Sequence, residues 1–350
     1  MKILPVILSI LFLISFSLLF HCCYTLKQGG IMISYLHSAV PLDSILTKEP
    51  ASEDDKIFVD NVNNIRRFAQ EELGLKKTKN YTNYVEIERD YLAAIVSASD
   101  KYSFKRYEWQ FPIVGSVPYK GFFEIEEARS EAAKLSKKNL DVWIRKTDAF
   151  STLGFFKDPL YSYMKDYTIN ELASLIIHES LHATVFVKGN MNFNEELAEI
   201  VGSEGALRYI KKLYGEDSKE LADIFAHEAD SKAFVSCVQD LISLLQAVYN
   251  LDIPNEEKLK QKEITIKNYQ ESFLENYDAN FKTDNYKGFA NMKINNAYLE
   301  LYRLYYQKDS ELKKLYKENG SDLIKFIAAA KTIKGTKAPL AQMKAGMMSF

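Results

Sequence analysis

The chain has 350 residues and a near-balanced charge, with 45 lysines and arginines against 47 acidic residues. This balance argues against a nucleic-acid-binding protein, which carries a basic excess. Hydrophobic residues make up 47% of the chain, enough for a sizeable core, and the length permits one large domain or two small ones.

The N-terminus has the pattern of a targeting segment. Lys2 precedes an apolar run from Ile3 to Phe20, and two cysteines, Cys22 and Cys23, follow. A run of this length is typical of a signal peptide or a membrane anchor. The cysteines favour a bacterial lipoprotein signal over residues 1–23, with Cys22 or Cys23 lipidated, although the residue before either cysteine is not the usual small one. An uncleaved anchor is the alternative.

Both alternatives predict the same cellular location. We expect a membrane-anchored protein of the bacterial cell envelope, whose folded, functional part lies outside the cytoplasm. The remaining chain, residues 24–350, is expected to form one unit, with a core of about 105–215 and a helical C-terminal part of about 216–330.

The elements expected before residue 160 alternate between helices and strands. Periodicity and turn residues predict an irregular tether, then helices, then short strands, another helix and further strands. The corresponding ranges are 24–50 for the tether, 54–73 and 86–99 for two helices, 111–123 for short strands, 125–139 for a helix and 141–156 for strands.

The strongest motif is His178-Glu179-Ser180-Leu181-His182, at the end of a helix that Thr168 and Glu171 can cap. Histidines four residues apart lie on one face of a helix, where both can bind one Zn²⁺. Glu179 then reaches a water at the open position of the metal and can act as general base. The alternative is a buried helix with two hydrogen-bonded histidines and an ordinary glutamate.

A catalytic zinc site normally takes three protein ligands. A short loop at 188–192 predicts that a second helix returns antiparallel to the first, bringing its first glutamates near the histidines. Glu195 is the favoured third ligand, and Glu199, on the same face, is a candidate for orienting a ligand histidine. The alternative is that these glutamates are a solvated helix terminus.

Several separate motifs occur in one order between about Phe111 and Ile210. They are PIVG at 112–115, VPYKGFF at 117–123, STLGFFKDPL at 151–160, the HESLH pentapeptide, VKGN at 187–190 and FNE at 193–195. In these motifs the chain resembles the bacterial family of predicted aminopeptidases.

The resemblance implies a zinc-dependent peptidase whose third ligand is the glutamate of the Asn-Glu pair, Glu195. It also directs attention to Tyr119, a candidate for stabilising the oxyanion, and to Asn194, a candidate second-shell or substrate-binding residue. In zincins a strand at the cleft edge holds the substrate backbone, and residues 151–154 are the candidate, with a plain structural strand as the alternative.

The C-terminal third is expected to be helical almost throughout. Helices are predicted over 218–248, 256–281, 290–306 and 309–330, with a loose tail from 331 to 350. His227 lies on the first of these helices and is interpreted as an exposed histidine. The fold class predicted is α+β, mostly α, with a zincin-like catalytic domain, a small sheet beside the HExxH helix and a helical C-terminal part.

The function predicted is zinc-dependent hydrolysis of peptides, most simply as an aminopeptidase, with the membrane as a second partner and no nucleic acid. An aminopeptidase also needs a carboxylate for the substrate amine, and Glu196, Glu199 and Glu204 stay open for that role. One alternative is an endopeptidase or amidase acting on envelope proteins or cell-wall peptides. Another is a non-catalytic envelope-anchored zinc-binding protein, against which Glu179 argues because a structural site needs no base.

Overall fold

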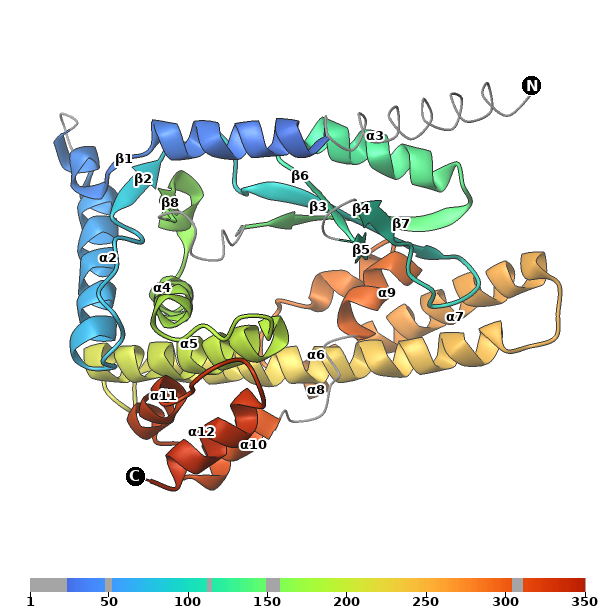
Figure 1. Ribbon diagram of the computed structural model, residues 1–350. Helices are drawn as coiled ribbons and strands as arrows, with labels where there is room; N and C mark the ends of the chain where they lie inside the picture. The colour runs from blue at the N-terminus through green and yellow to red at the C-terminus, as the bar shows by residue number, and fades with distance from the viewer. Residues whose placement is uncertain (1–23, 48–51, 112–114, 149–157, 304–310, 350) are drawn as a thin grey trace, which may run out of the picture. The chain divides into compact units, whose positions relative to one another are not determined.

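The computed structural model describes residues 24–47, 52–111, 115–148, 158–303 and 311–349 (Figure 1). The chain divides into two compact units, each drawn from three segments. The first unit takes Met1–Ser38, Tyr91–Phe150 and Asp230–Tyr306, and the second takes Ala39–Asp90, Ser151–Ala229 and Gln307–Phe350. Most of the described residues are helical and the sheets are small, so the predicted α+β, mostly α class is confirmed. The predicted division of the body into a core and a helical C-terminal part stays a prediction.

The first unit contains an antiparallel sheet of three strands in the order β6-β3-β7. β3 (Ala93–Asp100) pairs along its whole length with β7 (Leu140–Thr147), and its other edge pairs with β6 (Lys120–Phe122). A separate hairpin joins β4 (Trp109–Phe111) to β5 (Gly115–Val117). α3 (Ile125–Ser136) buries Ala128 and Leu135 against the β3 residues that point to one face of the sheet.

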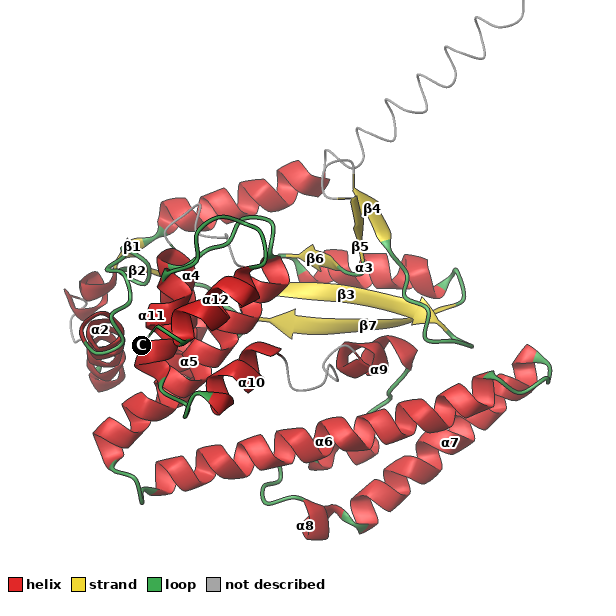
Figure 2. Cartoon of the chain, turned by 60° about the horizontal axis from the view of Figure 1, so that its bottom comes forward, coloured by secondary structure: helices red, strands yellow, loops and turns green. Residues whose placement is uncertain are grey.

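Helices complete the first unit, and one of them, α9, covers the other face of this sheet (Figure 2). They are α6 (Lys219–Tyr249), which belongs to this unit from Asp230 onward, α7 (Asn255–Glu275), α8 (Tyr277–Asn280), the 3₁₀ turn η3 (Lys287–Asn291) and α9 (Asn296–Arg303). Phe234, Phe273 and Phe289 form the centre of their aromatic core. A buried ion pair between Lys262 and Asp141 joins α7 to β7.

The second unit is built on α2, α4 and α5, with a small sheet in the order β1-β2-β8. Its elements are β1 (Val40–Pro41), η1 (Leu42–Thr47), α2 (Glu53–Glu71), β2 (Asn83–Val85), β8 (Leu160–Tyr161), η2 (Ser162–Asp166), α4 (Ile169–Thr184), α5 (Met191–Tyr214), α10 (Glu311–Glu318), α11 (Leu323–Lys331) and α12 (Pro339–Met347). Phe68 of α2 packs against Tyr209 of α5, and the two parallel residue pairs between β2 and β8 bring the chain to the start of α4.

Three secondary-structure predictions are wrong. The helix expected at 86–99 is replaced by strand β3, whose residues Ala93–Ser99 are buried on both faces. Burial on both faces removes the alternation of polar and apolar residues by which a strand is recognised. The expected tether contains a helix at residues 24–38, and the expected loose tail contains α12, which buries Met343 and Met347.

A fourth difference concerns the helix predicted over 309–330. Within the described residues it is two helices, α10 and α11. Gly320 and Ser321 both have positive φ, a backbone conformation that ends an α-helix. The predicted helices at 54–73, 125–139 and 218–248 match α2, α3 and α6 closely, and the predicted strands at 111–123 match β4, β5 and β6 where that segment is described.

Candidate metal centre

α4 carries the His-Glu-x-x-His motif and begins where the sequence indicates. The Thr168 side chain accepts a hydrogen bond from the Glu171 backbone N–H at 3.3 Å, and the Glu171 carboxylate accepts the Thr168 N–H at 2.8 Å. This confirms the capping box. The helix then buries its apolar side, Leu172, Ala173, Ile176, Ile177 and Leu181.

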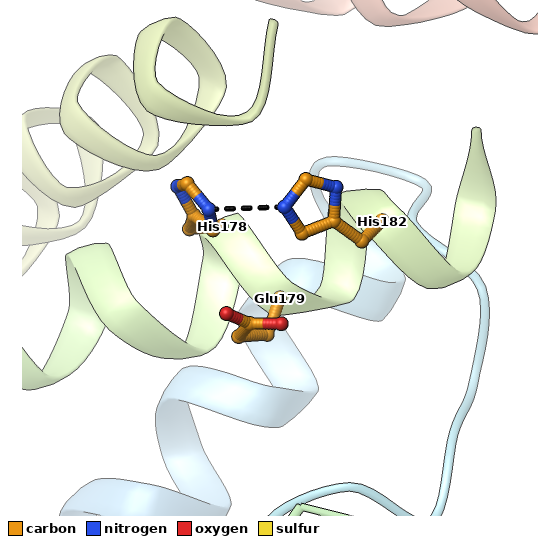
Figure 3. A group of neighbouring side chains, drawn as sticks. All are labelled: His178, Glu179 and His182. Atoms are coloured by element: carbon orange, nitrogen blue, oxygen red, sulfur yellow. Dashed lines mark hydrogen bonds between the residues drawn. The ribbon is translucent and has the colours of Figure 1, made fainter. Parts of the chain in front are cut away.

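His178 and His182 lie on one face of α4, one turn apart (Figure 3). Their Nε2 atoms are 3.1 Å apart, and their side chains are 25% and 8% exposed. The two histidines and Glu179 form one group, in which one ligand atom from each lies within 4.8 Å of the others. Two imidazole nitrogens thus converge at a partly buried point.

α5 packs antiparallel to α4, and a buried amide shapes the loop between them. Asn194 is 1% exposed, its Nδ2 donates to the Val187 carbonyl at 3.0 Å, and its Oδ1 accepts the Val187 N–H at 2.9 Å. Both ends of the amide are therefore occupied by the backbone that precedes α5. Asn194 was expected as a second-shell or substrate-binding candidate, and in the structure its contacts hold the loop.

Glu195 follows directly and reaches both histidines. One carboxylate oxygen lies 3.4 Å from His182 Nε2, and the other lies 3.6 Å from His178 Nε2. Its side chain is 46% exposed, so the cluster opens to solvent on this side. The sequence expectation that the returning helix brings Glu195 to the histidines agrees with this geometry.

Burial favours the neutral form of both imidazoles and brings the pKa of the Glu179 carboxyl close to neutral pH. Burial, together with the neighbouring His182, lowers the pKa of His178 to about 4. Burial also lowers the pKa of His182, against the opposing effect of the Glu195 carboxylate. Burial, with the nearby carboxylates of Asp158 and Glu195, raises the pKa of Glu179 to about 7, and this residue is only 9% exposed.

Two residues that sequence reasoning did not assign to the site belong to its surroundings. The negative charge of Asp158 acts on both Glu179 and His182, and the buried phenol of Tyr81 lies close enough to be affected by Glu179. The Tyr81 N–H donates to the Asp158 carbonyl at 2.8 Å, and Tyr81 holds a φ of 58°. Such a backbone conformation is uncommon for a tyrosine, and nothing in the sequence signals it.

The other glutamates of α5 point to different neighbours. The Glu196 carboxylate accepts a hydrogen bond from the Leu312 backbone N–H, and the Glu204 carboxylate accepts one from the Tyr316 hydroxyl at 3.3 Å. Leu312 and Tyr316 both belong to α10. Glu199 is exposed. Within the described residues, His182 Nδ1 is buried without a hydrogen-bond partner, so no carboxylate of this part of the chain orients the ring through that nitrogen.

The remaining candidates belong to the first unit or lie outside the described residues. Tyr119 belongs to the first unit, is 48% exposed and lines a pocket there. The lipidation candidates Cys22 and Cys23 and the proposed cleft-edge segment 151–154 lie outside the described residues. In the part of the chain that the structure describes, no helix has the length and hydropathy needed to cross a bilayer.

The helix α4 therefore presents His-Glu-x-x-His beside a carboxylate on α5, and these side chains could hold a metal ion. Comparison with family models matches residues 23–345 to one described as "Putative aminopeptidase". The match covers nearly the whole chain, and the chain belongs to this family. Searches of curated proteins and of solved structures each found no match. The family description indicates peptide hydrolysis.

Proposed function

We propose that the protein is a zinc-dependent metallopeptidase of the zincin type and acts as an aminopeptidase. The observation that carries the proposal is the convergence of three donor groups: His178 Nε2, His182 Nε2 and the Glu195 carboxylate are separated by 3.1, 3.4 and 3.6 Å. Ligands at 2.0–2.1 Å in a tetrahedral zinc site stand about 3.3–3.4 Å apart. The donor set and its spacing therefore fit Zn²⁺.

The chemistry of the donors supports the same metal. Two neutral imidazoles and one carboxylate leave a fourth position open, as catalytic zinc sites do. When bound, Zn²⁺ would acidify a coordinated water towards neutral pH and polarise a scissile carbonyl.

Glu179 supplies the acid–base chemistry in this proposal. Its carboxyl is buried beside the two histidines, and its pKa of about 7 lets it accept or release a proton near neutral pH. It takes a proton from the attacking water and passes it to the amine of the departing peptide. The nearby carboxylate of Asp158 favours the protonated form of Glu179 after the first transfer.

We also propose that the protein is located in the bacterial cell envelope and is anchored to the membrane by its N-terminal segment. The apolar run from Ile3 to Phe20 and the cysteines that follow it support this. Attachment at Cys22 or Cys23 is tested by mass spectrometry of the membrane fraction. A mature chain without a lipid and without the segment 1–23 would contradict the anchor.

The test of the activity separates metal binding from turnover. Glu179→Gln keeps the size of the side chain and removes the base, so the variant should bind one zinc per chain while hydrolysis falls by on the order of 10³-fold. Metal content and hydrolysis of peptides with a free amine are measured on the same preparation. Hydrolysis at the wild-type rate would refute the proposal.

Substrate preference is tested with the wild-type protein. Peptides with a free N-terminus and their N-acetylated forms are compared at equal concentration. An aminopeptidase cleaves the first set and spares the second. Equal cleavage of both sets would assign an endopeptidase instead.

A further inference from the structure

A pocket of about 570 Å³ lies within the first unit, and the site already described does not account for it. It sits on the face of the sheet that α9 covers, between β3, β7, α9, the middle of α6 and the connection from β5 to β6. Figure 2 shows β3 and β7 with α9 on one side of them. This volume falls in the range of small-molecule sites, about 300–1,000 Å³.

The wall of the pocket is mainly apolar. Aliphatic and aromatic residues from four segments converge on it. They are Ala98, Pro118, Val235, Ala297, Leu301 and Tyr302. A wall of this kind accepts the side chain of an apolar residue and releases water in doing so.

The charged groups of the pocket are two arginines, Arg106 and Arg145, and one glutamate, Glu300. Arg106 donates from Nε to the Glu300 carboxylate at 2.5 Å and from a terminal nitrogen to the Glu300 carbonyl at 2.6 Å. Glu300 is further balanced by Arg303 at 2.9 Å. Because two arginines share one carboxylate, this corner of the pocket has no excess of negative charge.

Arg145 differs from Arg106 in having no partner. It lines the pocket from β7, opposite Ile95, and none of the described residues forms a hydrogen bond or ion pair with it. The hydroxyl of Ser97, in a residue only 8% exposed on the same face of the sheet, likewise has no hydrogen bond within the described chain. A free guanidinium and a free hydroxyl beside an apolar wall match a carboxylate attached to an apolar body.

We propose that this pocket binds the free carboxyl end of a short peptide, with the terminal carboxylate on Arg145 and the last side chain against the apolar wall. An arginine fork can accept both oxygens of a carboxylate at once, which makes it selective for this group over an amide. That the carboxylate belongs to a peptide rests on the proposed peptidase function. That the ligand must carry a carboxylate rests only on the pocket and Arg145.

The test measures equilibrium binding without turnover. The full-length Glu179→Gln protein, freed of metal by a chelator, is titrated calorimetrically with N-acetyl-leucyl-phenylalanine and with the C-terminal amide of the same dipeptide. The acid should bind at least about tenfold more tightly than the amide, as a charge-assisted contact requires. Octanoate is titrated as an apolar carboxylate that is not a peptide.

Arg145→Met should abolish the preference for the acid. The substitution is tolerated because Arg145 is exposed and unpaired. Lys146→Met is the matched control: it removes one positive charge from the next position of β7, whose side chain points to the opposite face and lies over the Tyr91 ring. Val235→Phe reduces the pocket and should weaken the binding of acid and amide alike.

Three results would overturn the proposal. They are equal binding of acid and amide, an undiminished preference in Arg145→Met, and octanoate binding as tight as the peptide acid, which would assign the pocket to apolar carboxylates in general. Because the titration needs neither metal nor Glu179, failure here leaves the zinc peptidase proposal intact. If zinc-dependent hydrolysis fails instead, the titration still tests whether the pocket prefers the peptide acid to the amide.

Discussion

Gly202 of α5 lies against His178 of α4. A Cβ placed on Gly202 would stand 3.1 Å from the Cβ of His178 and 3.0 Å from the Ser174 carbonyl oxygen. Both neighbours belong to the backbone or lie next to it, so they cannot move aside as the tip of a long side chain can. The missing side chain at position 202 lets the two helices approach closely, and this approach brings Glu195 within reach of the histidines.

The first prediction follows from this contact. An alanine in a helix normally stabilises it by about 1 kcal/mol relative to glycine. Gly202→Ala should instead destabilise the protein, and by separating α4 from α5 it should weaken zinc binding by about tenfold. Thermal unfolding and competition with a chromogenic chelator measure the two effects. Gly288→Ala, at a position with no atom within 4 Å of the added Cβ, is the control. A zinc affinity unchanged in Gly202→Ala would refute the role of the close approach.

Two glutamates on one face of α5 give the second prediction. Glu195 lies 3.4 Å from His182 Nε2, whereas Glu199 is exposed. Glu195→Gln removes an anionic donor and should lower zinc affinity on the order of 100-fold or more. Glu199→Gln makes the same change of charge on the same helix and should alter the affinity by less than about threefold.

Competitive titration of the two variants in one buffer decides between them. If Glu199→Gln loses zinc and Glu195→Gln retains it, the ligand assignment must be exchanged. If both variants bind as the wild type does, the carboxylate ligand lies elsewhere.

Sequence predicts the convergence of the four side chains because they are near one another along the chain. His178, Glu179 and His182 are fixed by the helical period, and Glu195 follows from a short loop that forces an antiparallel return. Tyr81 was not predicted because it lies far along the chain from α4 and its positive φ has no sequence signal. Asp158 lies close to α4 in sequence, but no helical period or turn motif indicates that its carboxylate acts on Glu179. The role of Gly202 was not predicted because a glycine within a helical pattern does not indicate which neighbouring helix packs against it.

The fold shows the same limit. α4 is recognised because its apolar stripe and capping box agree, whereas β3 is mistaken for a helix because both of its faces are buried. Burial on the second face depends on α9, which comes almost 200 residues later, as the contact of Asn296 with the Asp100 carbonyl illustrates. Local periodicity cannot report a partner so distant in sequence.

The third prediction concerns the pH dependence of stability without metal. The pKa of Glu179 is about 7 in the folded protein against 4.5 for the free side chain. Between these values the native state binds more protons than the unfolded state, so the stability contributed by Glu179 falls as the pH rises from about 4.5 to 7. The full effect is roughly 3 kcal/mol at most.

The glutamine side chain of the Glu179→Gln variant stays neutral, so the variant should not lose stability in this way as the pH rises. The metal-free variant should match the wild type near pH 4.5 and exceed it in stability at pH 8. The two histidines are present in both proteins, so their own titration largely cancels from the difference. Urea unfolding at several pH values measures it, with the exposed Glu263→Gln as control. A difference that does not grow with pH would show that Glu179 titrates normally.

The last prediction concerns the loop that leads into α5. Asn194 is buried and holds both the N–H and the carbonyl of Val187. Asn194→Ala leaves the Val187 N–H without this partner, while the Val187 carbonyl still accepts the Asn190 N–H at 3.1 Å, and it should cost about 1–3 kcal/mol of stability. Because Glu195 is the next residue, zinc affinity should fall as well. Asn194→Asp keeps the acceptor for the Val187 N–H, loses the donor to the carbonyl, and should be intermediate in both measurements.

Asn190→Ala provides the matched control for this loop. The Asn190 amide donates to the Thr336 carbonyl at 2.9 Å, but this hydrogen bond is exposed to solvent, so water replaces the lost contact. Its removal should cost less than about 1 kcal/mol and leave zinc affinity unchanged. Chemical unfolding gives the stabilities and chelator competition gives the affinities. If Asn194→Ala is destabilised but binds zinc as the wild type does, the loop amide supports the fold without setting the position of Glu195.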